Sequence, residues 1–228
     1  MHLTSYGTKQ IVIGAVVFIV LAALCVMLYR NGGRWGYLVP LIPLVVAFCW
    51  MLAFFRDPDR VVPTTPGLIV SPADGTITHV DTADEPEYIE GSAQRLSIFL
   101  SIFNVHLNRA PADGTVEFVK FRPGEFFDAR REESLVKNQN QDIGIKTSEP
   151  GMPAKMVVRQ STGAIARTIV CPVRPGDTLA RGDRYGMIKF GSRTTLFLSD
   201  DVEVEWLVSV GDAVKAGETV VARVKTPQ

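Results

Sequence analysis

The sequence predicts a mainly β domain, of the α+β class, that follows an N-terminal transmembrane helical hairpin. Two long apolar runs open the chain, short β-rich runs separated by proline and glycine fill the rest, and two short motifs each occur twice. The hydrophobic share of 46% is therefore an average over an apolar leader and an ordinary domain. We expect a membrane anchor at residues 1–56 and a β-rich domain at residues 57–228.

The formal charge of zero divides unequally between these parts. Residues 1–55 contain three basic residues and no acid, which gives +3, whereas the remainder has 21 basic and 24 acidic residues, which gives −3. This balance excludes a strongly basic nucleic-acid-binding protein. Three cysteines without a Cys-x-x-Cys pair and three histidines without ligand spacing indicate buried thiols in a reducing compartment and no metal site.

The two apolar runs predict a hairpin of membrane-spanning helices. They are Ile11–Tyr29 and Leu38–Phe55, and at about 1.5 Å per residue each approaches the ~30 Å hydrocarbon layer. Pro40 and Pro43 fall in the first turns of the second run, where proline costs a helix least. A cleaved signal peptide fits less well, because the first run is long for its apolar region and no small-x-small site precedes Arg30.

Basic residues next to the spans predict the orientation. Lys9, Arg56 and Arg60 lie on one side of the hairpin and Arg30 and Arg34 on the other. Because basic residues favour the cytoplasmic side, three against two favours a cytoplasmic domain. Arg56 and Arg60, at the end of the second span, are also candidates for contact with lipid phosphates.

The first repeated motif is Pro-Ala-Asp-Gly-Thr, at residues 72–76 and again 39 residues later at 111–115. Each copy predicts an Asp-Gly turn that runs into a strand. The side chains of Asp74 and Asp113 could each cap their own turn or take part in chemistry. The motif alone leaves both interpretations open.

The second repeated motif has the pattern V-x-x-G-D-x-apolar-x-x-G. Its copies are Val173–Gly182 and Val208–Gly217, and they resemble the half-motifs of lipoyl and biotinyl carrier domains. This resemblance implies a barrel-sandwich-hybrid element of short strands. A carrier lysine should lie midway between the halves, but Leu198–Asp201 contains none and Lys189 lies in an apolar run. We therefore expect the architecture without the carrier chemistry.

Three further segments need interpretation. His106 closes the alternating stretch SIFLSIFNVHLNRAP, which predicts a strand that ends at a turn near Pro111. The step Phe190–Arg193 lies between apolar runs and predicts a strand bulge or a turn. Residues Glu125–Glu149 are polar and charged, which favours a loop or short helix over the core.

Three of these segments together carry a family resemblance. VSPADG contains Asp74, IFLSIFNVHLNRAP contains His106, and FGSR contains Gly191 and Ser192, in this order. The chain resembles the phosphatidylserine decarboxylase proenzyme family, in its short bacterial, pyruvoyl-dependent branch, over essentially the whole domain. Family members commonly show Asn-Glu-Arg where this chain has Asn138-Gln139-Asn140, a difference that bears on head-group preference or rate.

The resemblance implies a self-processing enzyme. The precursor would cut itself between Gly191 and Ser192 into a β chain of residues 1–191 and an α chain of residues 192–228, and Ser192 would become a covalent pyruvoyl cofactor. His106 would serve as the base for Ser192, and Asp74 would fix the histidine tautomer and stabilise the imidazolium. His106 is also the first candidate for the acid in the later decarboxylation.

The implied reaction converts phosphatidylserine to phosphatidylethanolamine and CO2 through a Schiff base, in phospholipid biosynthesis at the bacterial inner membrane. The implied partners are this lipid and the two chains of one precursor, and a homo-oligomer is compatible with them. An alternative hypothesis is a non-catalytic, membrane-tethered barrel-sandwich adaptor, which explains the hairpin and the Gly-Asp repeats. It gives no role to Asp74, His106 and Ser192. A carrier protein modified on Lys189 is a third hypothesis.

Overall fold

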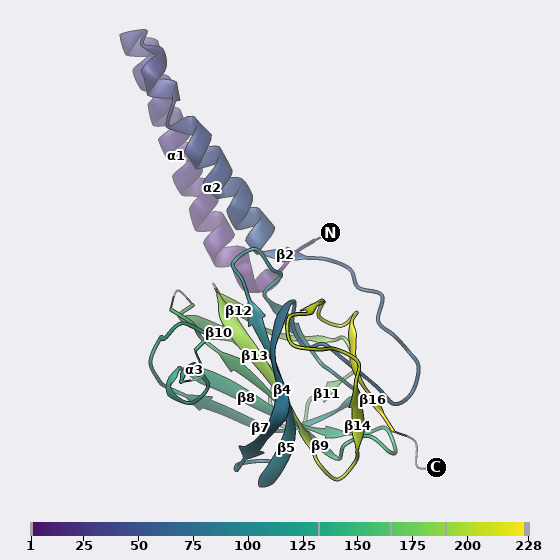
Figure 1. Ribbon diagram of the computed structural model, residues 1–228. Helices are drawn as coiled ribbons and strands as arrows, with labels where there is room; N and C mark the ends of the chain where they lie inside the picture. The colour runs from purple at the N-terminus through teal and green to yellow at the C-terminus, as the bar shows by residue number, and fades with distance from the viewer. Residues whose placement is uncertain (1, 132, 165, 190, 226–228) are drawn as a thin grey trace. The chain divides into compact units, whose positions relative to one another are not determined.

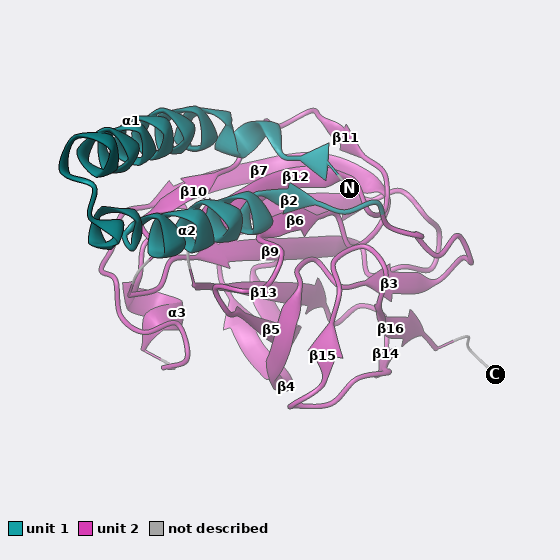
Figure 2. Ribbon diagram, turned by 90° about the horizontal axis from the view of Figure 1, so that it is seen from above, with its two compact units in different colours: residues 1–59 teal, residues 60–228 magenta. Residues whose placement is uncertain are grey.

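The chain folds into two compact units. The computed structural model describes residues 2–131, 133–164, 166–189 and 191–225. The units comprise residues 1–59 and 60–228 and are coloured separately in Figure 2. The sequence places the boundary after residue 56. Strand β2 (Arg56–Asp57) pairs with strand β1 (His2–Leu3) just past the end of the second helix.

The first unit is a pair of apolar helices. Helix α1 spans Thr8–Gly32 and helix α2 spans Leu41–Phe54, and they form the antiparallel hairpin in Figure 1. With the short 3-10 turns at Ser5–Gly7 and Trp35–Leu38, they are long and apolar enough to cross a membrane, with mean hydropathy values of 3.2 and 2.2. Pro40 is the N-cap of α2, which places proline at the helix start as predicted.

The two helices pack through an aromatic pair and a small residue. The rings of Phe18 and Phe48 stack with their centroids 4.9 Å apart. A Cβ atom at Gly14 would lie 2.5 Å from the end of the Met51 side chain, so glycine lets this side chain lie against the helix backbone. Small residues at such contacts are typical of helix pairs in membranes, where van der Waals packing drives association.

The second unit consists mainly of β-strands, as predicted. Its first strands are β3 (Leu68–Val70), β4 (Gly75–Glu85), β5 (Gly91–Leu100), β6 (Leu107–Arg109), β7 (Gly114–Arg122) and β8 (Asn140–Thr147), with the short helix α3 (Ser134–Lys137) before β8. The later strands are β9 (Lys155–Ser161), β10 (Thr168–Val170), β11 (Thr178–Leu179), β12 (Arg184–Lys189), β13 (Ser192–Ser199), β14 (Val204–Trp206), β15 (Ala213–Val214) and β16 (Val220–Val224).

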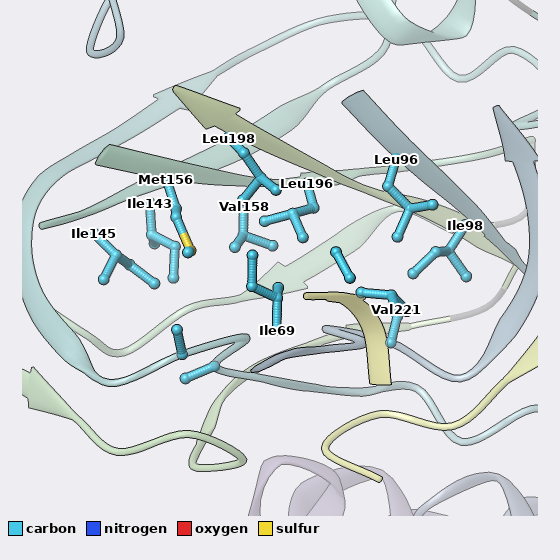
Figure 3. Packing of buried hydrophobic residues seen from close by; sticks show 14 of the residues in the cluster. Ile69, Leu96, Ile98, Ile143, Ile145, Met156, Val158, Leu196, Leu198 and Val221 are labelled. Carbon is cyan, nitrogen blue, oxygen red and sulfur yellow. The ribbon is translucent and has the colours of Figure 1, made fainter. Parts of the chain in front are cut away.

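The strands form one large and two small antiparallel sheets. The eight-stranded sheet curls into a half-barrel with the order β11-β7-β8-β9-β13-β5-β4-β15. The small sheets have the orders β10-β12-β6 and β14-β16-β3. Side chains from the large sheet and from β3 and β16 meet in one buried hydrophobic cluster. Figure 3 shows its members Ile69, Leu96, Ile98, Ile143, Ile145, Met156, Val158, Leu196, Leu198 and Val221.

The sheet orders reveal an internal duplication. In the large sheet, β11-β7-β8-β9 mirrors β15-β4-β5-β13 around the central β9–β13 pair, and the small sheets correspond strand by strand. Each Pro-Ala-Asp-Gly-Thr motif pairs with one Gly-Asp motif, because Thr115 lies opposite Thr178 and Thr76 lies opposite Ala213. The two repeats found in the sequence are therefore halves of one pseudo-twofold arrangement.

Backbone hydrogen bonds repeat in the two halves. The Ile77 nitrogen donates to the Asp212 carbonyl at 2.9 Å, and the equivalent Val116 nitrogen donates to the Asp177 carbonyl at 2.8 Å. The loops also share a left-handed glycine, with φ of +99° at Gly176 and +100° at the equivalent position 211. Since side chains rarely adopt this conformation, both Gly-Asp turns need glycine there.

One expectation was wrong. Residues 125–149 were expected to be a loop or short helix, but their last third is strand β8, inside the large sheet. Its polar Asp142 is fully buried, and the carboxylate lies 2.8 Å from the guanidinium groups of both Arg122 and Arg159. A buried charge is tolerated when it is paired in this way, which is why a polar sequence forms an interior strand.

Gly75→Ala and Gly114→Ala should destabilise the domain to a similar extent. An ideal Cβ would lie 2.2 Å from the Phe99 carbonyl oxygen at the first site and 2.4 Å from the Lys146 carbonyl oxygen at the second. Such overpacking costs typically about 1–3 kcal/mol of unfolding free energy, measured by urea unfolding of the detergent-solubilised chain. Gly91→Ala is the control because no atom lies within 4 Å of its Cβ position. Strongly unequal losses would contradict the pseudo-twofold equivalence.

Candidate active site

The Gly-Ser step predicted as a bulge or turn connects two strands. β12 ends at Lys189 and β13 begins at Ser192, with Gly191 in a bend at φ +54°, while Phe190 lies outside the described residues. The Ser192 side chain is fully buried, and its Oγ has no hydrogen-bond partner among the described residues. A buried hydroxyl without a partner is costly, which marks this serine as a functional candidate.

His106 lies next to the Gly-Ser step. The backbone N–H of Gly191 donates to its Nε2 at 3.3 Å, and its Nδ1 lies 3.0 Å from the carbonyl oxygen of Asn104. A carbonyl oxygen only accepts hydrogen bonds, so Nδ1 carries the proton and Nε2 presents a lone pair. The fully buried imidazole therefore has the tautomer of a base on the side that faces the Gly-Ser step.

The loop that carries His106 differs from the predicted strand. β5 ends at Leu100, a turn follows, and β6 begins only at Leu107. The Asn104 Oδ1 accepts hydrogen bonds from the backbone nitrogen and the hydroxyl of Ser101, at 2.9 and 2.7 Å. This side-chain-to-backbone turn interrupts the alternating pattern. Asn104 in an otherwise apolar run was the signal for it.

Asp74 caps a neighbouring loop. Its Oδ1 accepts a hydrogen bond from the backbone nitrogen of Ala216 at 2.8 Å. Both carboxylate oxygens also accept from Arg60, at 2.9 and 2.8 Å, and Arg60 lies 3.3 Å from Glu218. Arg60, expected to contact lipid phosphates, thus has its guanidinium engaged by two carboxylates.

The Asp74 loop runs beside the strand that follows His106. The Pro72 carbonyl accepts hydrogen bonds from the backbone nitrogen of Arg109 at 2.9 Å and from the Asn108 side chain at 3.3 Å. The structure thus places His106 at the Gly-Ser step. It places the Asp74 loop beside β6, the strand that follows His106. The direct partnership of Asp74 with His106 stays a prediction.

Asp113 is the structural counterpart of Asp74. Its Oδ1 accepts from the backbone nitrogen of Arg181 at 2.7 Å, and Arg181 occupies the same motif position as Ala216. The Asp113 loop lies beside β3, because the Val70 backbone nitrogen donates to the Pro111 carbonyl at 3.0 Å, and the residue before β3 that corresponds to His106 is Gly67. Asp113 therefore has the capping contact of Asp74 without a neighbouring base.

A buried amide network near Ser192 was missed in the sequence. The Asn108 side chain donates to the Thr194 hydroxyl at 2.9 Å and accepts from the Gln160 side chain at 2.8 Å. These residues connect β6, β13 and β9 two positions beyond Ser192, and all three side chains are fully buried. Buried hydrogen bonds of this kind fix strand positions, so they hold the start of β13 in place, although the Gln160 Oε1 has no partner among the described residues.

Two other hypotheses can be compared with the structure. The Lys189 side chain is buried in β12, whereas a modified carrier lysine has to be exposed on a hairpin. Among the described residues, no group of three His, Cys, Asp or Glu side chains could hold a metal ion. The position of Lys189 therefore differs from that of a carrier lysine.

Comparisons with known proteins identify the family. The sequence profile of the phosphatidylserine decarboxylase family matches residues 48–222. A phosphatidylserine decarboxylase proenzyme of Rhodopirellula baltica is 43% identical over 218 residues, which cover 95% of this chain and 86% of the relative. A proenzyme of the same name from Carboxydothermus hydrogenoformans is 45% identical, over 83% of this chain and 84% of the relative.

The chain belongs to the phosphatidylserine decarboxylase family, whose members are carboxy-lyases. This confirms the family and the enzyme class that the motifs around Asp74, His106 and Ser192 implied. It contradicts the hypothesis of a non-catalytic adaptor.

Arg60 and Asp74 should be energetically coupled. Their side chains are only 7% and 11% exposed, so removal of one partner leaves a poorly solvated charge. A double-mutant cycle with Arg60→Met and Asp74→Asn, in the Ser192→Ala background, should give a coupling of about 1–3 kcal/mol in unfolding free energy. Additive effects would show that the ion pair is not formed in solution.

Proposed function

We propose that this chain is the precursor of a phosphatidylserine decarboxylase that forms phosphatidylethanolamine and CO2 after cutting itself between Gly191 and Ser192. The observation that carries the proposal is the contact of His106 Nε2 with the Gly191 backbone, beside the buried hydroxyl of Ser192. The base contacts the N–H of the left-handed Gly191, and the nucleophile is the next residue along the chain.

Self-cleavage would begin when His106 Nε2 exchanges the Gly191 N–H for the Ser192 hydroxyl and takes its proton. The Oγ attacks the Gly191 carbonyl carbon, and the C–N bond to Ser192 breaks, which leaves an ester and a free amine. Loss of the Ser192 Cα proton then breaks the Cβ–Oγ bond and releases the Gly191 carboxylate. Hydrolysis of the remaining dehydroalanine consumes one water, releases ammonia and leaves the pyruvoyl group at position 192.

His106 and Asp74 divide the work of proton transfer in this scheme. The Asn104 carbonyl holds the Nδ1 proton, so the imidazole needs no carboxylate to select its tautomer. We assign Asp74 the electrostatic task, which is to stabilise the imidazolium after His106 takes the proton. Its nearly buried carboxylate and its attachment to β6 through Pro72 support this role.

The residues around position 192 fit a covalent pyruvoyl group. Ser192 is buried at the start of a central strand, which keeps water scarce. Its Oγ, which has no hydrogen-bond partner among the described residues, is removed from residue 192 by the proposed processing. Once formed, the group supplies an electron sink for the loss of CO2. His106 could hold a proton at Nε2 and deliver it to the carbon that CO2 leaves, a task typically worth ~10²- to 10⁴-fold in rate.

The cut chains are expected to stay together as one enzyme. Residues 192–228 contribute β13 to the large sheet, where it pairs with β5 and β9, and they contribute β15 and β16, which pair with β4 and β3. All of these partner strands belong to the 1–191 fragment. The α chain is therefore an integral part of the fold of the β chain.

The helix pair suggests where the enzyme works. Two helices of membrane-spanning length would anchor it in the bacterial inner membrane, where the lipid substrate also resides. The basic residues Lys9, Arg56 and Arg60, against Arg30 and Arg34, favour a cytoplasmic catalytic domain.

Denaturing electrophoresis of the full chain tests the proposal. The wild type should give two fragments and release CO2 from phosphatidylserine in mixed micelles, whereas Ser192→Ala should remain one inactive 25.0 kDa chain. An active preparation that consists only of the uncut chain would refute the proposal. A cut chain without decarboxylase activity would refute the assigned substrate.

Asp74→Asn and Asp113→Asn form a matched pair for the proposed triad. Both aspartates accept one backbone N–H from equivalent loops, at 2.8 and 2.7 Å, and asparagine can keep that bond. Self-cleavage, followed by pulse-chase electrophoresis, should slow by at least about 10²-fold for Asp74→Asn and stay near the wild-type rate for Asp113→Asn. Equal effects of both substitutions would reduce Asp74 to a structural cap.

A further inference from the structure

Gly163, in the segment after β9, lies against the Gly191 carbonyl. An ideal Cβ at Gly163 would lie 2.3 Å from the Gly191 oxygen and 3.3 Å from its carbonyl carbon. Real Cβ atoms essentially never approach another heavy atom to less than 3.0 Å. Glycine is therefore required here by the position of one carbonyl group, which belongs to the proposed scissile bond.

The segment around Gly163 is itself held in place. The Thr162 backbone nitrogen and hydroxyl both donate to the Gln139 carbonyl at 3.0 Å. The side-chain nitrogen of Asn138 donates to the Thr162 carbonyl at 2.8 Å. The Ala129 Cβ would also lie 3.2 Å from a Cβ at Gly163. The hydrogen bonds of Thr162 and Asn138 therefore hold Gly163 close to the Gly191 carbonyl.

The Asn138 side chain links the Thr162 segment to the backbone of Phe127. Its Oδ1 accepts from the Phe127 backbone nitrogen at 2.8 Å, and its Nδ2 donates to the Phe127 carbonyl at 2.9 Å as well as to Thr162. The side chain is 1% exposed, and both of its polar atoms are engaged. This residue begins the Asn138-Gln139-Asn140 segment, in which the chain departs from the pattern of its family.

We propose that Gly163 and Asn138 are positioning residues for self-cleavage, which orient the Gly191 carbonyl for attack by Ser192. Gly163 contacts the carbonyl, His106 accepts the Gly191 N–H, and together they hold this left-handed residue on both of its peptide groups. Asn138 acts through Thr162, because its hydrogen bond holds in place the segment that contacts the Gly191 carbonyl. The inference rests on the self-cleavage proposed above.

The expected effect follows from the geometry. A Cβ at Gly163 has to move the carbonyl by about 1 Å to reach ordinary contact, and a misplacement of that size can cost ~10²-fold in rate. Gly163→Ala should therefore accumulate uncut chain, with cleavage at least about 10²-fold slower than in the wild type. Its melting temperature should match that of Ser192→Ala, which is also uncut.

The stage of the block can be read with hydroxylamine at neutral pH, which cuts esters; its alkaline cleavage of Asn-Gly bonds concerns Asn31-Gly32 and would not release residues 192–228. If Gly163 positions the carbonyl for attack, no ester forms in Gly163→Ala, and hydroxylamine does not release the fragment of residues 192–228. Release of that fragment by hydroxylamine would place the defect after ester formation and overturn the proposal. Gly91→Ala, at an open glycine site, is the control and should be cut at the wild-type rate.

Asn138→Asp provides a second variant that keeps the side-chain shape. It retains an acceptor for the Phe127 N–H but loses the donations to Phe127 and Thr162, and cleavage should slow by about 10-fold. Wild-type cleavage rates in both Gly163→Ala and Asn138→Asp would overturn the positioning role, as would slow cleavage with a melting temperature far below that of Ser192→Ala. An uncut wild-type chain would instead refute the proposed function itself.

Discussion

The structure depends on the position of strand β13. Its eight residues are all buried, and it pairs with β9 on one side and β5 on the other, at the centre of the eight-stranded sheet. This pairing fixes Ser192 at the first position of a strand whose register cannot shift, because a one-residue slip would exchange its Leu196 and Leu198 face with the face that carries Arg193 and Thr195. A rigid strand start and a left-handed glycine before it are what an attack by Ser192 on the preceding carbonyl requires.

The pseudo-twofold axis of the sheet passes between β9 and β13, so the candidate site lies where the two halves of the duplication differ. Both halves keep the Asp-Gly turn and its capping contact, at Asp74 and Asp113, because the sheet edges need them. One half has His106 where the other has Gly67. The two Asp-Gly loops are thus equivalent in structure, but a histidine precedes only the strand that lies beside the Asp74 loop.

Much of the structure could be predicted from the local sequence. The helix pair, the Asp-Gly turns and the break before Ser192 follow from apolar length, turn residues and glycine. The interior position of Asp142 could not be predicted in this way. Its partners Arg122 and Arg159 are distant in sequence, and no local pattern indicates a buried ion pair. The contact of Gly163 with Gly191 was equally invisible, since it joins segments 28 residues apart through the folded sheet. The Asn104 turn could have been read from the sequence, but the alternation around it favoured a continuous strand.

The central claim is that the geometry around Gly191 and Ser192 converts one chain into two and a serine into a ketone. The most direct measurement is the intact mass of the small chain from purified wild-type protein. The account predicts the 37 residues from position 192 to 228, lighter by one ammonia than the peptide with an N-terminal serine, and a carbonyl that hydrazine reagents label. A small chain with a free serine amine, or a single uncut mass from active protein, would contradict it.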